Sequence, residues 1–137
     1  MAIYEFRMTE ENYSDFMTAL KNTENVAGYY GKLSIGKFDI EILIDDGGYE
    51  KEERQKKHIV LFNFYHLGVD SNYGKTKSGV PYSLEEEYAE RFDGSEWSDF
   101  SGFKNKVHQI AEAYFKRKYT DPKKYAEEVA CPVADWA

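Results

Sequence analysis

The sequence predicts an α+β domain in which helices pack on an antiparallel sheet. Segments 28–45 and 58–67 have the patterns of β-strands, whereas the C-terminal third has the apolar spacing of helices. Strands thus gather in the first half of the chain and helices in the second, which is typical of an antiparallel sheet with helices on one face. We expect one domain over residues 1–137, with three to four strands, an N-terminal helix and two to three C-terminal helices.

The segment 28–45 has the pattern of a β-hairpin. Apolar and polar residues alternate on both sides of Gly36-Lys37, and a two-residue connection with glycine first suits a tight turn of the primed type. The run 58–67 is apolar on both faces, so we place it centrally in the sheet. The weak alternation of Ile3–Arg7 predicts a short edge strand.

Four helices are expected from apolar spacing and from capping residues. The first begins after Thr9, and its apolar stripe is Tyr13, Phe16, Met17 and Leu20. The second is predicted from a capping box at Ser83 and Glu86, with apolar residues four apart at Leu84, Tyr88 and Phe92. The longest has its apolar face at Phe103, Val107, Ile110, Ala111, Tyr114 and Phe115. The last begins at Asp121-Pro122 and is anchored by Tyr125 and Val129.

Composition and charge restrict the location and the partners. The formal charge of −7 argues against direct binding of nucleic acid, whose phosphates require lysine and arginine. The start of the chain lacks a signal pattern, and no apolar run approaches the ~18 residues of a membrane helix. The lone Cys131 has no partner for an internal disulfide. We therefore expect a protein of the cytoplasm, either of a bacterium or of a host cell, without membrane contact.

The familiar catalytic motifs are missing from the sequence. The loop from Gly68 to Thr76 has five residues between its glycines where a phosphate-binding P-loop needs four, and Pro81 follows soon after it. Three histidines, of which His66 ends the central strand, are too widely spaced to form a zinc site. We expect no cofactor and no bound metal. The loop 68–82 remains a candidate contact, with the contact residues Asn72, Tyr73, Lys75 and Lys77.

A pair of carboxylates offers a second kind of chemistry. Asp39 and Glu41 lie two residues apart, so they share one face of a strand at a separation of roughly 7 Å. Such pairs hold Mg²⁺ in some nucleases. A hairpin face exposed to water is the favoured account of them. A small metal-dependent enzyme that uses Asp39 and Glu41 is therefore kept as an alternative.

Charges are distributed unevenly along the chain. Seven acids and one base lie between Glu85 and Asp99, whereas seven bases and two acids lie between Lys104 and Lys124. The acids alternate with aromatic residues, a combination that suits a protein partner with a basic surface. The predicted partner-binding residues are Glu86, Glu87, Glu90, Asp93, Glu96, Trp97, Asp99 and Phe100.

These observations favour a non-catalytic protein-binding domain. One specific form is a small acidic inhibitor from a phage or mobile element, of the anti-CRISPR or anti-restriction type, that occupies the nucleic-acid-binding groove of its target. A homo-oligomeric structural or ligand-binding module is a further alternative, because the twelve tyrosines can bury at a symmetric interface. The groove hypothesis requires that the acids of 85–99 are not paired with the bases of 104–124.

Overall fold

Six antiparallel strands form one sheet in the computed structural model, which describes residues 4–21, 28–44, 59–69, 73–91 and 99–130. The elements are β1 (Tyr4–Arg7), α1 (Glu10–Lys21), β2 (Gly28–Ile35), β3 (Phe38–Ile44), β4 (Ile59–Leu67), β5 (Gly74–Lys75), β6 (Pro81–Arg91), α3 (Phe100–Lys118), α4 (Pro122–Tyr125) and the π-helical turn η1 (Ala126–Ala130). The strand order is β1-β2-β3-β4-β6-β5, and every neighbouring pair is antiparallel. This confirms the predicted α+β class, with more strands than the three to four expected.

The two predicted strand segments are confirmed in their pairing. Ile35 lies opposite Phe38 across the Gly36-Lys37 turn, where Gly36 has a φ of 55°. β4 lies centrally, with β3 on one side and β6 on the other. The chain from β1 to β4 forms an antiparallel sheet whose edge is β1, as the alternation of the first residues predicts.

The predicted helix at Ser83–Phe92 is wrong, because residues 81–91 form strand β6. Leu61 pairs with Ala89 and Asn63 with Glu87, so β6 completes the hydrogen bonding along the second edge of β4. The ladder shifts register at Glu85, between the pairs Tyr65–Leu84 and Phe64–Glu86. Pairing with a buried strand outweighs the helix propensity of the glutamates and Ala89, which amounts to only tenths of a kcal/mol per residue.

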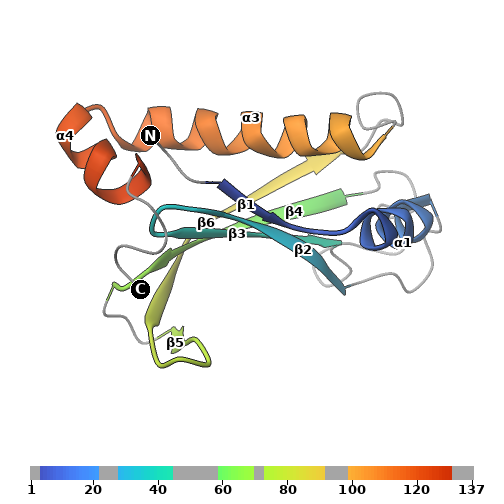
Figure 1. The fold of residues 1–137 in the computed structure, drawn as a ribbon, viewed down its shortest axis with the longest axis horizontal. Helices are drawn as coiled ribbons and strands as arrows, with labels where there is room; N and C mark the ends of the chain where they lie inside the picture. The colour runs from blue at the N-terminus through green and yellow to red at the C-terminus, as the bar shows by residue number, and fades with distance from the viewer. Residues whose placement is uncertain (1–3, 22–27, 45–58, 70–72, 92–98, 131–137) are drawn as a thin grey trace.

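One long helix covers one face of the sheet. α3 runs along this face, whereas β5 projects from the opposite side (Figure 1). The apolar residues of β2, β3 and β4 meet the buried face of α3, which consists of Phe103, Val107, Ala111, Tyr114 and Phe115. Of the predicted apolar face, Ile110 is only partly buried.

The two ends of this layer are held by shorter helices. α1 begins after Thr9, whose Oγ1 accepts a hydrogen bond from the backbone N–H of Asn12, and Phe16 of α1 packs on Phe103. At the other end, Asp121 caps α4 and Val129 of η1 is fully buried, as predicted. No helix in the described part of the chain is long and apolar enough to cross a membrane.

Candidate functional site

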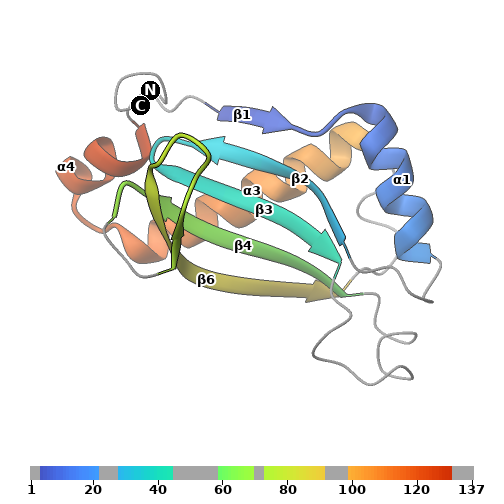
Figure 2. The same cartoon turned by 90° about the horizontal axis from the view of Figure 1, so that it is seen from below.

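No described helix packs on the face of the sheet opposite α3 (Figure 2). Strand register brings the residues of this face together: Ser34 pairs with Asp39, Lys32 with Glu41, Asp39 with Tyr65, and Glu41 with Asn63. Glu87 of β6 continues the row beside Asn63. We call this surface the open face; its polar and aromatic residues are Tyr29, Lys32, Ser34, Asp39, Glu41, Asn63, Tyr65, Tyr82 and Glu87. The row that begins at Tyr29 continues with the apolar residues Leu43, Leu61 and Ala89.

A short hairpin crosses in front of one end of the open face (Figure 2). This β5 hairpin, residues 73–82, is closed by backbone hydrogen bonds from Thr76 to Val80 and from Gly79 to Thr76. Tyr73 packs on Tyr65 and on Tyr82, with ring centroids 5.8 and 5.4 Å away. The three tyrosines attach the hairpin to the sheet.

A cavity of about 280 Å³ lies between the β5 hairpin and the sheet. The sheet contributes acidic and aromatic side chains to it, and the hairpin contributes lysines. Its lining residues are Lys32, Asp39, Glu41, Tyr65, Leu67, Lys75, Thr76, Lys77 and Tyr82. The cavity therefore brings together the loop residues and the carboxylate pair that the sequence singled out separately.

Asp39 is fully engaged within this cavity. Its Oδ2 accepts from Lys32 Nζ at 3.0 Å, and its Oδ1 accepts from the hydroxyl of Ser34 at 2.7 Å. Ser34 is itself only 3% exposed, so these bonds hold the carboxylate rigidly on the sheet. Asp39 thus shapes the cavity wall.

Glu41 differs from Asp39 because its carboxylate makes no hydrogen bond or ion pair with any described residue. Burial raises the pKa of Glu41; Lys32 lowers it in part, and Asp39 raises it further. Its neighbour Asn63 has a buried Oδ1 that also lacks a hydrogen-bond partner within the described ranges. Unsatisfied polar groups of this kind cost stability and are typical of binding sites.

Three of the four predicted loop contacts lie at this site. Tyr73 is 55% exposed, and Lys75 and Lys77 line the cavity without an ion pair to any described residue. Asn72 lies outside the described residues. Burial, followed by hydrogen bonding to Tyr73, raises the pKa of Tyr65, so this hydroxyl stays protonated and can donate or accept.

The predicted acidic surface is divided by the fold. Glu90 pairs with Lys106 at 2.8 Å and Glu86 with Arg117 at 3.3 Å, so two of its acids face α3. Asp99 caps α3 by accepting from the Gly102 N–H, and Phe100 packs on Tyr13. Glu87 lies on the open face, while Asp93, Glu96 and Trp97 lie outside the described residues.

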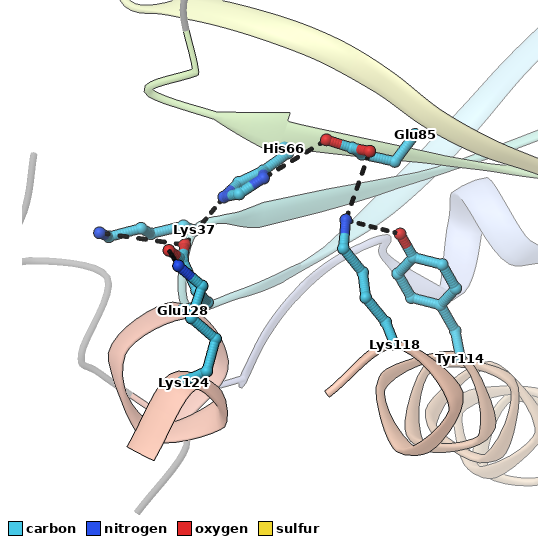
Figure 3. Close-up of polar contacts among 7 residues, drawn as sticks. All are labelled: Lys37, His66, Glu85, Tyr114, Lys118, Lys124 and Glu128. Carbon is cyan, nitrogen blue, oxygen red and sulfur yellow. Dashed lines mark hydrogen bonds and ion pairs between the residues drawn. The ribbon is translucent and has the colours of Figure 1, made fainter. Parts of the chain in front are cut away.

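His66 belongs to a separate ion-pair cluster that ties the C-terminal turn to the sheet (Figure 3). Its Nε2 lies 2.8 Å from Glu128 and its Nδ1 lies 3.4 Å from Glu85, while its ring stacks on Phe38 at 4.5 Å. Lys118 bridges Glu85 to the hydroxyl of Tyr114. Because both ring nitrogens contact carboxylates, His66 of β4 joins Glu85 of β6 to Glu128 of η1.

The metal-dependent alternative lacks a ligand set in the described part of the chain. No group of three His, Cys, Asp or Glu residues there is arranged to hold an ion. The fold and the site thus define an α+β domain with one open sheet face and a roofed polar cavity. No protein-family model, curated protein or solved structure matches the chain.

The carboxylate of Glu41, which has no ion pair within the described part of the chain, should reduce the stability of the fold at neutral pH. Because folding raises the pKa of Glu41, the stability linked to its protonated form is present below the unfolded value of about 4.3 and is lost as pH rises through the folded value. Glu41→Gln should therefore raise the melting temperature at pH 7, and the gain should vanish at acid pH. The matched variant Asp39→Asn should instead lower it, because Lys32 and Ser34 lose a charged acceptor. Thermal melts from pH 3 to 8 would measure both, and a destabilised Glu41→Gln protein at pH 7 would contradict this account.

Proposed function

We propose that the protein is a non-catalytic domain that binds another protein through the open face and the β5 hairpin. The observation that carries the proposal is a set of charges, Glu41, Lys75 and Lys77, that line one cavity and have no ion pair within the described residues. The cavity lies on the sheet face that no described helix covers. Glu41, which is half-buried and has no ion pair within the described ranges, gains most when a partner supplies its counter-charge, whereas Lys75 and Lys77 are exposed.

Exposed aromatic rings extend the same surface. Tyr29 at the far end of β2 is 54% exposed, similar to Tyr73 on the hairpin. Tyrosines at such positions bury a large area in a complex while keeping a polar tip, and they are enriched among the residues that dominate binding. Tyr73 adjoins the cavity through its contacts with Tyr65 and Tyr82, whereas Tyr29 lies on the same face beside Leu43, beyond Glu41.

Binding rather than catalysis suits the chemistry of the lining. Asp39 is immobilised by Lys32 and Ser34, and none of the lining residues is a histidine or a cysteine. The groove hypothesis, in which Glu86 and Glu90 contact a basic target, has less support because both acids already pair with α3. We therefore assign the contact to the open face, where a basic group of the partner would meet Glu41.

The proposal can be tested by affinity capture from the native cell with tagged variants. Tyr29→Ala and Tyr73→Ala remove the two exposed rings of this surface. Tyr88→Ala is the matched control, because Tyr88 is a tyrosine that is 37% exposed but lies on the α3 side of β6, beside Phe62. We expect a bound protein that each open-face variant loses and that Tyr88→Ala retains. The affinity measured with that purified protein should fall at least about tenfold for each open-face variant.

Two outcomes would contradict the proposal. A partner retained by both open-face variants and lost by Tyr88→Ala would place the interface on the α3 side. A stable homodimer in solution whose interface includes Tyr29 and Tyr73 would favour the homo-oligomeric alternative, so the mass in solution is measured alongside.

A further inference from the structure

The cavity under the β5 hairpin presents opposite charges on its two walls. Glu41 lies on β3, in the sheet, and Lys75 and Lys77 lie on the hairpin that roofs it. None of the three makes an ion pair within the described residues, whereas the neighbouring Lys32 and Asp39 pair with each other at 3.0 Å. The free charges are therefore divided between floor and roof.

A ligand of a single charge fits this arrangement poorly. A simple cation would neutralise Glu41 but would add a positive charge beside two lysines. A simple anion would satisfy the lysines and leave a half-buried carboxylate more deeply desolvated than before. Only a group with a positive and a negative end meets both walls at once.

The size and the walls of the cavity restrict the ligand further. Its volume of about 280 Å³ lies near the lower end of the ~300–1,000 Å³ of small-molecule sites. The rings of Tyr65 and Tyr82, 5.4 Å apart, line it and can pack on an aliphatic chain or on the face of a cation.

We infer that this cavity binds a zwitterionic group of amino-acid size, with its ammonium or guanidinium end on Glu41 and its carboxylate end on Lys75 and Lys77. The inference rests on the proposed binding role of the open face and names the chemistry that this face recognises. The group can come from a free amino acid or from neighbouring basic and acidic side chains of a partner protein. Both sources share the same two charged ends.

Matched small probes test the requirement for two charges. 6-Aminohexanoate carries both ends, hexylamine only the cation and hexanoate only the anion, and the three have nearly the same carbon chain. We expect 6-aminohexanoate to shift the amide NMR signals of β3 and of the β5 hairpin, with an affinity at least about tenfold above either single-charge probe, which corresponds to about 1.4 kcal/mol. Equal binding of hexanoate or of hexylamine, or no binding of 6-aminohexanoate at millimolar concentration, would overturn the inference.

Variants locate the two ends of the ligand. Glu41→Gln should lower the affinity for 6-aminohexanoate about tenfold and should not lower that for hexanoate, because no carboxylate is then desolvated. The double variant Lys75→Met, Lys77→Met should also lower the affinity for 6-aminohexanoate about tenfold, and it should not lower that for hexylamine. Glu87→Gln, an exposed acid on the same face outside the cavity, should leave all affinities unchanged. If Glu41→Gln and Glu87→Gln have the same effect, the cation does not bind at Glu41.

Two more ligands distinguish the sources and separate this inference from the proposed function. Free arginine represents an amino acid, and the capped dipeptide acetyl-Lys-Glu-amide represents a protein segment; binding of either supports the zwitterion chemistry, and the tighter one identifies the source. If no zwitterion binds but a captured protein still depends on Tyr29 and Tyr73, this inference alone fails. If zwitterions bind but no protein depends on those tyrosines, the proposed protein-binding role fails instead.

Discussion

Replacing Gly36 by alanine should destabilise the protein by about 3 kcal/mol or more, because one substitution disturbs both a turn and the docking of the C-terminal segment. Gly36 has a φ of 55°, and a Cβ atom there would lie 2.5 Å from the carbonyl oxygens of Glu128 and Val129. A left-handed backbone costs alanine about 1–2 kcal/mol. The rest comes from moving η1, which weakens the hydrogen bond from the Lys37 N–H to the Glu128 carbonyl and exposes Val129.

Gly79→Ala separates the two contributions to this effect. Gly79 also has a positive φ, 88°, but a Cβ atom there would have no neighbour within 4 Å. Chemical denaturation should thus give a loss of about 1–2 kcal/mol for Gly79→Ala. Faster hydrogen exchange at Lys37 should be seen for Gly36→Ala alone. Equal losses of unfolding free energy for the two variants would show that the contact of η1 with the turn at Gly36 does not contribute to stability.

The sequence predicts best those elements whose signal is local. Alternation on either side of Gly36-Lys37 determines the β2–β3 pair, and a wide apolar stripe determines α3 with Phe103, Val107 and Ala111 at its buried face. In each of these elements, the residues of one face are buried in the same core. Their burial therefore appears as a regular spacing of apolar residues along the sequence. Thr9 and Asp121 likewise cap the helices that follow them.

Strand β6 shows why local patterns fail elsewhere. Its glutamates and the spacing of Leu84 and Tyr88 favour a helix, yet it becomes a strand because β4 requires a partner on its second edge. A usable signal was present in the prediction that 58–67 is central, since a central strand needs two neighbours. Charged side chains on β6 also suit a strand near the edge of a sheet, where they discourage pairing between molecules.

The candidate site was only partly predictable because it depends on how distant segments fold together. The sequence identified Asp39, Glu41, Tyr73, Lys75 and Lys77 in two unrelated contexts. The β5 hairpin brings the loop lysines and the carboxylate pair to one cavity. The spacing of residues along the chain does not predict this contact. Tyr29, Lys32 and Asn63 were missed because their roles come from register across β2, β3 and β4.

Reversing the charge of Glu90 should destabilise the fold by about 2–3 kcal/mol, although the sequence alone places this acid on a surface for a partner. Glu90 and Lys106 form a 2.8 Å ion pair whose side chains are only 17% and 22% exposed. Glu90→Lys would leave two ammonium groups side by side near the core, with little water to screen them. Glu86→Lys should cost less than about 1 kcal/mol, because Arg117 is 60% exposed, and Glu87→Lys less than about 0.5 kcal/mol.

The graded series separates an internal role of these acids from a role in binding. A surface kept for a basic partner would allow all three reversals with little change in folding stability, as the groove hypothesis requires. The ion-pair account instead expects the order Glu90, Glu86, Glu87 in urea denaturation, and it expects the swap Glu90→Lys with Lys106→Glu to recover most of the loss. If Glu90→Lys unfolds at the same urea concentration as the unmodified protein, the pairing with α3 carries no stability and the acids of β6 are free to serve a partner.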